Sequence, residues 1–209
     1  MLQSNIPWPG GARCAICISW DIDIDTTIHL ERPDTGYKEY GVLSSLRYEE
    51  VGIHNVVEAL EEPGLQQTFF VCGWCLERYP GVCGEIISHG HEVAHHGYLH
   101  EPPNEQSPER ESPKPPQQAV EYFMSTFDAA YRIGGFATTI WHPEISGRPS
   151  RLLAWADMVR ELQKRGDVWI APLRDIAGHV LKLSEAGEIS LREVSVPFYT
   201  GPIPELERS

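Results

Sequence analysis

The sequence predicts an α/β fold with a mainly parallel sheet or barrel. Short apolar runs with the length of buried strands alternate along the chain with segments of helical periodicity, and this alternation is typical of β–α–β units. Polar side chains directly follow several of these strands, where α/β enzymes place their chemistry. A chain of 209 residues is long enough for one domain with a single core.

The first expected strand covers 13–20 and leads into the sequence DIDID at 21–25. Polar residues with glycine and proline follow at 31–48, where we expect a long loop. Apolar residues recur at helical spacing in 49–61, and Pro63-Gly64 is expected to end this helix.

Four shorter elements follow. A strand is expected at 68–71, and a short turn or helix at 75–79. Pro80 suits the first position of a helix that reaches Ser88. A third short strand is expected at 91–94, directly before a histidine-rich stretch.

The segment 102–118 contains six prolines among charged residues, and we interpret it as a solvated linker. Beyond it, apolar spacing and glycine turns predict three helices and two strands. The helices are expected at 117–131, from Pro149 to a stop at Gly166, and at 173–183, and the strands at 136–141 and 168–171. Residues 184–209 show no clear period and are expected to form a C-terminal tail.

The charge and the first residues of the chain exclude several classes of partner. A net charge of −13 argues against nucleic acid, whose binding domains present a basic face, and against an anionic membrane surface. The first 20 residues lack a basic n-region, and their apolar run is too short to span a membrane. We therefore expect a cytoplasmic protein without a membrane partner.

The five cysteines do not suggest a disulfide framework, because their number is odd and no signal peptide is recognised. Cys14 and Cys17 lie in an expected strand, where residues three apart point to opposite faces, so we expect them in the core. Cys72 and Cys75 follow a strand and open a helix, as the cysteines of a dithiol redox motif do. A dithiol redox protein is therefore an alternative hypothesis.

The stretch SHGHEVAHHGYLHE at 88–101 holds five of the nine histidines. His96 and His100 are four residues apart, so on one helical turn both imidazoles would project from the same face. Imidazole binds zinc, iron, nickel and copper alike, and this pair is a candidate for two ligands of one metal. The alternative interpretation is a polar surface loop, or histidines that hydrogen-bond to their neighbours.

Three expected strand ends carry polar groups: the aspartates Asp21 and Asp23, the histidine pair, and His142. Parallel strands bring such ends to one side of the sheet. Two histidines and one aspartate make a three-ligand site with a position open for water, as in hydrolytic metal centres. The second aspartate is then a candidate general base, and His142 is a candidate proton donor to the leaving group.

Four stretches together resemble the polysaccharide deacetylase family (NodB-homology domain). They are WDID, TFFVCGWCLERYP, GHEVAHHGYLHE and WHPEISGRPSR. The similarity covers residues 10–105 and 120–180, and it is greatest to an intracellular branch of peptidoglycan-deacetylase-like, allantoinase-like and cyclic-imide hydrolases. The resemblance implies an irregular (β/α) barrel that hydrolyses non-peptide carbon–nitrogen bonds with a divalent metal.

Motif by motif, the resemblance implies that Asp21 is the catalytic base and that Asp23, His96 and His100 bind the metal. His142, in the family's late histidine motif, would be the acid or would stabilise the oxyanion. The repeated DIDID sequence leaves a second register open, in which Asp23 and Asp25 take the two aspartate roles.

Nearby polar residues are expected to support this site rather than to form it. His91 and His95 are expected around the ligands or at the sheet end, not on the metal. Arg148 and Arg151 are expected to hold the loop that carries His142 rather than to bind substrate.

The resemblance fails in the middle of the chain. Family members continue after the histidine motif with several strands and helices, including an Arg-x-Pro segment whose arginine steadies the catalytic aspartate. Here 102–118 stands in place of that region, and Arg110-Glu-Ser-Pro113 is a poor substitute. Because a (β/α)₈ barrel needs about 250 residues, we expect an incomplete or open barrel. It would form one domain at 10–183, interrupted at 102–118.

We therefore expect a metal-dependent hydrolase in which a metal-bound water attacks the carbonyl of an N-acetyl sugar, as in carbohydrate metabolism, or of a small cyclic amide. The missing signal peptide favours the cyclic amide. Zinc is the first expectation for the metal, with iron, cobalt and nickel as alternatives. A metal-binding relative without turnover is a further alternative. An apolar surface left by the missing elements would favour a homo-oligomer.

Overall fold

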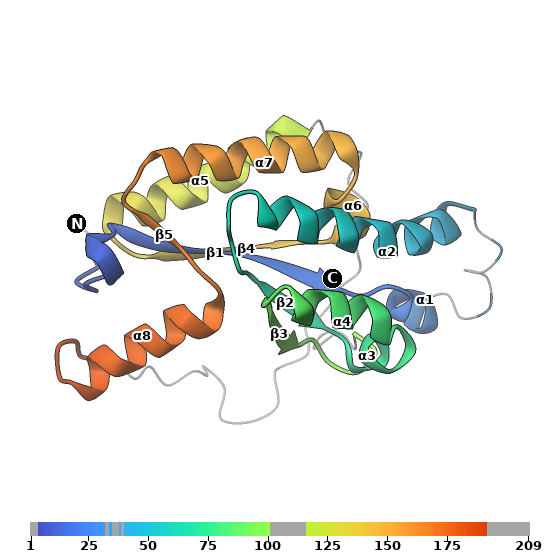
Figure 1. Cartoon of the computed structure of the whole chain (residues 1–209), viewed down its shortest axis with the longest axis horizontal. Helices are drawn as coiled ribbons and strands as arrows, with labels where there is room; N and C mark the ends of the chain where they lie inside the picture. Colours follow the sequence, from blue (N-terminus) through green and yellow to red (C-terminus); the bar gives the residue numbers. More distant parts are fainter. Residues whose placement is uncertain (1–3, 32–33, 35–37, 39, 101–115, 192–209) are drawn as a thin grey trace, which may run out of the picture.

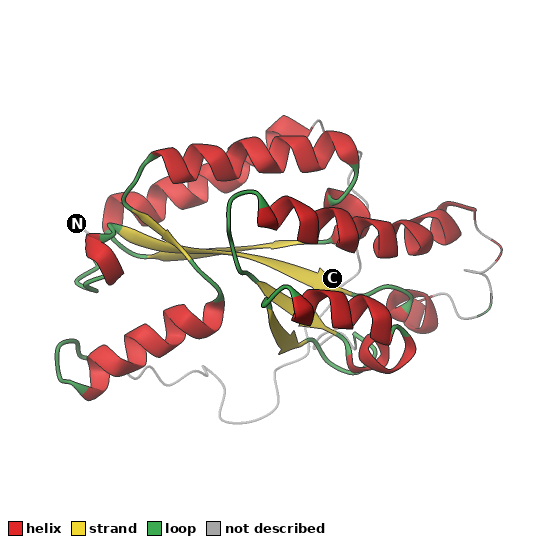
Figure 2. Ribbon diagram, viewed as in Figure 1, coloured by secondary structure: helices red, strands yellow, loops and turns green. Residues whose placement is uncertain are grey.

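The structure, a computed structural model, describes residues 4–31, 34, 38, 40–100 and 116–191. Its centre is a sheet of five parallel strands with helices on both faces (Figures 1 and 2). The strands are β1 (Cys14–Ile22), β2 (Thr68–Val71), β3 (Glu92–His95), β4 (Phe136–Trp141) and β5 (Val168–Ile170). The helices are η1 (Pro9–Gly11), α1 (Thr26–Glu31), α2 (Tyr40–Glu61), α3 (Gly73–Arg78), α4 (Pro80–Ser88), α5 (Pro116–Ile133), α6 (Pro143–Ser146), α7 (Pro149–Lys164) and α8 (Leu173–Glu185).

The other strands are arranged around β1. β4 pairs with it from Ala15 to Trp20, while on the opposite edge β5 pairs with residues 14–16 and β2 with residues 20–22. Between β5 and β2 the buried side chain of Gln67 replaces a strand partner, because its Oε1 accepts a hydrogen bond from Ile18 N at 2.8 Å. β3 pairs with the outer edge of β2. All carboxyl ends therefore lie at one edge of the sheet.

Two apolar clusters hold the layers together. The larger one packs the sheet against α2, α4, α5 and α7, and α2, α5 and α7 lie together on one side of the sheet in Figure 1. Its fully buried side chains include Trp20 and Trp155, whose ring centroids are 5.6 Å apart. The smaller cluster joins β1 to α8 on the opposite face, and it contains Trp8, Ala15, Cys17, Ala171 and Ile176.

Over the described residues the sheet is open, because β3 and β4 remain at the two ends of its order. On β4 the alternate residues Phe136 and Ile140 are 40% and 52% exposed, whereas Trp141 is buried in the core. The predicted α/β fold with a mainly parallel sheet is confirmed, and of the two predicted forms, incomplete or open, the structure shows an open sheet.

β2, α4 and β4 have the bounds that the sequence predicts. The prediction of a loop over 31–48 is wrong from residue 40 onwards, because α2 begins at Tyr40, and most of 32–39 lies outside the described residues. Its first turns contain the sequence GVLSS at 41–45, and glycine and serine lower helix propensity, which concealed this part of the helix. β1 also extends beyond the predicted end at residue 20, so Asp21 lies within the strand itself.

The second half of the chain needs smaller corrections. α5 begins at Pro116, inside the segment predicted as linker, and the rest of that segment, with Arg110, lies outside the described residues. The short helix α6 was not predicted. α8 ends at Glu185, slightly inside the predicted tail, and residues 192–209 are outside the described part of the chain. The limits of the domain stay a prediction.

Among the helices that the structure describes, none has the length and apolar character needed to cross a membrane.

Candidate metal centre

Asp21 and Asp23 lie where β1 ends. Successive strand residues point to opposite faces, so the two aspartates share one face while Ile22 and Ile24 are buried on the other. Both carboxylates are themselves largely buried, with 5% and 7% exposure. Ile24 has a φ of 47°, a rare conformation for a β-branched residue, and this turn ends the alternation directly after Asp23.

Asp25, beyond that turn, lies in a different environment. Its Oδ1 accepts a hydrogen bond from Trp74 Nε1 at 2.9 Å, and its Oδ2 lies 3.3 Å from His29 Nε2. The structure therefore brings Asp21 and Asp23 to the candidate site and directs Asp25 towards α1 and α3. This geometry favours the first predicted register over the alternative of Asp23 with Asp25.

His96 and His100 follow β3 in a loop, so the prediction of a helical turn is wrong. The loop bends at Gly97 and at His100 itself, with φ values of 76° and 59°. The first turn of α3 holds this loop in place, because Gly73 N and Trp74 N donate hydrogen bonds to Gly97 O and Tyr98 O at 2.9 and 3.0 Å. The two imidazoles thus converge through loop geometry rather than through helical spacing.

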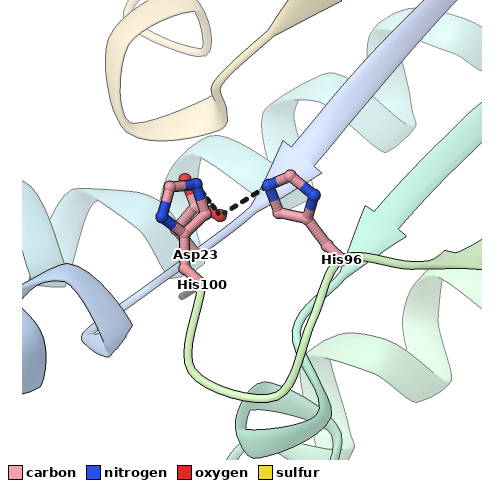
Figure 3. A group of neighbouring side chains, drawn as sticks. All are labelled: Asp23, His96 and His100. Atoms are coloured by element: carbon pink, nitrogen blue, oxygen red, sulfur yellow. Dashed lines mark ion pairs between the residues drawn. The ribbon is translucent and has the colours of Figure 1, made fainter. Parts of the chain in front are cut away.

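Asp23, His96 and His100 form a compact group (Figure 3). Asp23 Oδ1 lies 3.5 Å from His96 Nε2 and 4.0 Å from His100 Nε2. One candidate ligand atom from each residue lies within 4.8 Å of the other two. Two imidazole nitrogens and one carboxylate oxygen are a common ligand set for zinc and for other transition metals.

Asp21 and His142 border this group. Asp21 Oδ2 is 3.3 Å from His96 Nε2 and 4.0 Å from His142 Nε2, and His142 Nε2 is 3.5 Å from Asp23 Oδ2. The ends of β1, β3 and β4 therefore bring together all five residues that the sequence predicted for the site.

The position of His142 depends on the packing of α6. His142 is the residue before α6, and its carbonyl oxygen accepts hydrogen bonds from Ile145 N and Ser146 N at 3.1 and 2.7 Å. Arg148 Nε donates to Glu144 O at 2.8 Å, and Arg151 Nη1 donates to Ile145 O at 2.9 Å. Both arginines therefore contact the backbone of α6, as expected for residues that hold this loop.

The polar atoms at the centre fit a bound cation. His96 Nε2 and Asp21 Oδ1 are buried, and neither has a hydrogen-bond partner within the described part of the chain. Burial raises the pKa of the Asp21 carboxyl and Asp23 adds to this effect, while His96 and His142 act in the opposite direction. A buried polar atom without a hydrogen bond is costly, and a divalent ion held by Asp23, His96 and His100 would satisfy His96 Nε2.

The remaining candidates from the sequence lie away from the ligand atoms. His91 is buried with its Nδ1 accepting a hydrogen bond from Gln67 N at 3.2 Å, and His95 is exposed at the end of β3. Both positions agree with the prediction that neither residue binds the metal. All five cysteines are buried, including Cys72 and Cys75, and none of them forms a disulfide. Burial does not favour the dithiol alternative, because a redox thiol must meet its substrate.

Sequence reasoning missed the residues that position this site. Gly52 and Gly147 allow α2 and α6 to approach closely, since a Cβ on Gly52 would lie 2.3 Å from Pro143 O. Cys72 and Cys75 contact the segments that carry Asp23 and His96. A cysteine pair next to a strand was a visible signal, but its spacing suggested redox chemistry, and neither glycine stands out in a single sequence.

Comparison with known proteins confirms the resemblance that the motifs indicate. Residues 47–143 match the family model described as polysaccharide deacetylase. The matched range includes His96, His100 and His142 but neither Asp21 nor Asp23. None of the curated protein sequences compared with the chain matches it.

Three solved structures share the fold. A protein from Mycobacterium smegmatis, assigned as a polysaccharide deacetylase, has a TM-score of 0.79 at 22% identity over 95% of this chain and 100% of that chain. A Pseudomonas aeruginosa PAO1 protein with the same assignment has a TM-score of 0.68 at 16% identity, over 84% and 93%. PuuE allantoinase has a TM-score of 0.67 at 16% identity, over 82% and 91%. At these identities the likeness concerns the fold alone.

Proposed function

We propose that this chain, a relative of the polysaccharide deacetylases, is a metal-dependent hydrolase of non-peptide carbon–nitrogen bonds. The observation that carries the proposal is the convergence of five side chains from three strand ends. Three of them can ligate one cation, while Asp21 Oδ2 lies 3.3 Å from His96 Nε2 and His142 Nε2 lies 3.5 Å from Asp23 Oδ2. A site with three protein ligands and neighbouring acid–base groups is typical of hydrolytic rather than structural metal centres.

Asp23, His96 and His100 would hold one divalent ion. Zinc suits this ligand set best, and iron, cobalt or nickel are the alternatives. When bound, such an ion polarises an amide carbonyl and lowers the pKa of a water molecule. Asp23 is well placed as the anionic ligand, because it is buried and lies within 4.0 Å of both histidine nitrogens.

Asp21 would act as the general base. Its Oδ2 would accept the proton of the attacking water, and the raised pKa of this buried carboxyl makes it a stronger base than an exposed aspartate. His142 Nε2, 4.0 Å from Asp21 Oδ2 on the neighbouring strand end, would then donate a proton to the leaving nitrogen. The general base would thus come from the end of β1 and the general acid from the end of β4.

The proposed substrate is an N-acetylated sugar or a small cyclic amide. The family match supports the first class, and the fold shared with PuuE allantoinase supports the second. Both substrate classes contain a carbonyl carbon bonded to nitrogen, so the same five residues would serve either reaction. A substrate panel must separate the two classes.

A second candidate is a metal-binding protein without turnover. The observation that favours it is Asp21 Oδ1, which is buried without a hydrogen-bond partner among the described residues. In the family an arginine steadies this aspartate, and the ion pairs described for Asp21 involve only the histidines His96 and His142. Loss of orientation at a catalytic base costs rate while metal binding persists.

The test is a hydrolysis assay on the zinc- or cobalt-loaded protein. The panel contains N-acetylglucosamine oligomers, a cyclic imide and a cyclic ureide, each with and without a chelator. We expect turnover of one class, abolished by the chelator and reduced about 10²–10⁴-fold in Asp21→Asn. Asp25→Asn is the matched control, since Asp25 contacts Trp74 and His29 instead. Stoichiometric metal without turnover of any substrate would favour the second candidate.

A further inference from the structure

Cys72 and Cys75 are not accounted for by the proposed reaction. Both side chains are fully buried, at 0% exposure. Cys72 is the residue before α3 and Cys75 lies in its first turn. Burial separates them from any external thiol or disulfide, so their position has to be explained by what they touch inside the protein.

Each thiol contacts a segment that carries a proposed metal ligand. Cys72 Sγ donates to His96 O at 3.3 Å and lies 3.9 Å from Asp23 Oδ1. Cys75 Sγ donates to Asp23 O at 3.3 Å. The two thiols therefore join the end of β1 to the start of the loop that contains both histidines.

These contacts begin where the sheet stops holding the two segments. Residues beyond the ends of β1 and β3 no longer have a full set of strand partners. At these ends the backbone hydrogen bonds between strand segments run from Cys72 N to Ile22 O and from His96 N to Val71 O, at 3.3 and 3.2 Å. The hydrogen bonds of the two thiols come directly after these backbone bonds, so they connect the same segments as far as Asp23 and His96. Cysteine suits this place because it is small, apolar and still a weak donor.

We propose that Cys72 and Cys75 are positioning residues that fix Asp23 and His96 in the geometry required for metal binding. The proposal rests on the proposed metal site and adds a role that neither the redox motif nor a core packing role implies. Partners of metal ligands typically contribute 10–100-fold to metal affinity or activity. A residue that only fills the core would affect stability without affecting the affinity for the metal.

The experiment compares Cys72→Ala, Cys72→Ser and Cys14→Ala by Co²⁺ titration, followed by visible absorption, and by thermal unfolding. Cys14 is the matched control, because it is equally buried at 0% exposure but lies at the opposite end of β1. We expect Cys72→Ala to weaken Co²⁺ binding about 10–100-fold. Cys72→Ser, which keeps a donor, should recover part of that loss, and Cys14→Ala should bind Co²⁺ as the wild type does.

A second measurement on the wild type covers the case in which Cys72→Ala does not fold. Slow alkylation of the thiols, mapped by peptide mass spectrometry, is followed with and without Co²⁺. We expect the ion to slow modification of Cys72 and Cys75 several-fold more than that of Cys14. Equal slowing of all three cysteines would overturn the positioning role.

The outcomes separate this inference from the proposed function. If the wild type binds Co²⁺ and Cys72→Ala binds it equally well with an unchanged spectrum, the positioning role is wrong and the metal centre stands. An equal loss of affinity in Cys14→Ala would also overturn the role, because the effect would then reflect general stability. If the wild type binds neither Co²⁺ nor Zn²⁺, the metal centre and the positioning role both fail.

Discussion

Five histidines lie within residues 89–100, yet they occupy different environments. His89 is at the surface, where its Nε2 lies 3.1 Å from Glu61 Oε1. His91 is buried against Gln67, with 6% exposure, whereas His96 and His100 face Asp23. Spacing identified the correct pair, but only the burial and partners of each ring distinguish a candidate ligand from a structural histidine.

His91 predicts a pH dependence of stability. Burial, with the nearby charges of His89 and Arg174, lowers its pKa to about 4 from an ordinary 6.5. Above pH 6.5 both the folded and the unfolded chain hold this ring neutral. Between pH 6.5 and about 4 the unfolded chain binds a proton that the folded chain does not, so the free energy of unfolding falls as the pH falls. The loss is up to roughly 3 kcal/mol.

Urea unfolding of the wild type and of His91→Gln between pH 7.5 and 4 measures this effect. The difference in free energy of unfolding between the wild type and His91→Gln should shrink as the pH falls, because the variant has no ring to protonate. His54→Gln is the control, since His54 is exposed and the pKa of its ring is raised by Glu85. The same pH slope in the wild type and in His91→Gln would show that His91 is not the group responsible.

At the scale of elements, the contact between α2 and α6 fixes His142. A Cβ on Gly147 would lie 2.6 Å from Pro143 O and 2.7 Å from Gly52 Cα. Asn55 Nδ2 adds a hydrogen bond to Gly147 O at 3.1 Å. The two helices thus touch through their backbones, and α6 has no room to shift towards α2.

Gly52→Ala is therefore expected to displace α6 and with it His142. The new Cβ, 2.3 Å from Pro143 O, requires a shift of about 1 Å, and misplacement of that size can cost about 10²-fold in rate. Metal content should stay unchanged, because Asp23, His96 and His100 lie on other segments. The measurements are kcat on the identified substrate and metal per chain.

Gly84→Ala is the matched control for this prediction. Gly84 lies inside α4, where an added Cβ meets nothing within 4 Å, and alanine there should stabilise the helix by up to about 1 kcal/mol. Wild-type kcat in Gly52→Ala would show that the contact between α2 and α6 does not position a catalytic group.

Elements with a clear pattern were predicted well, and those set by tertiary contacts were not. β2, α4 and β4 have apolar periods or a proline start, and their bounds are confirmed. α6 is only four residues long and forms where α2 packs, so its own sequence carries little signal. The histidine loop bends at Gly97 and His100, and the four-residue spacing of His96 and His100 cannot reveal such a bend.

At the scale of the whole molecule, the sequence predicted the α/β fold, the parallel sheet and the family resemblance. It also led us to expect a barrel with missing parts, and the described residues form an open sheet ordered β3-β2-β1-β4. The contacts made by Cys72 and Cys75 could not be predicted, because they join residues more than 20 positions apart. The cytoplasmic location, the homo-oligomer and the domain limits stay predictions.

The central claim is that one divalent ion binds Asp23, His96 and His100. Elemental analysis of metal per chain tests it most directly, on the wild type, on a His96→Ala/His100→Ala double variant and on a His54→Ala/His89→Ala control that removes two surface histidines. We predict about one ion per chain in the wild type and the control, and almost none in the double variant. A wild type without metal after incubation with zinc, cobalt or iron, or equal metal in the double variant, would contradict the claim.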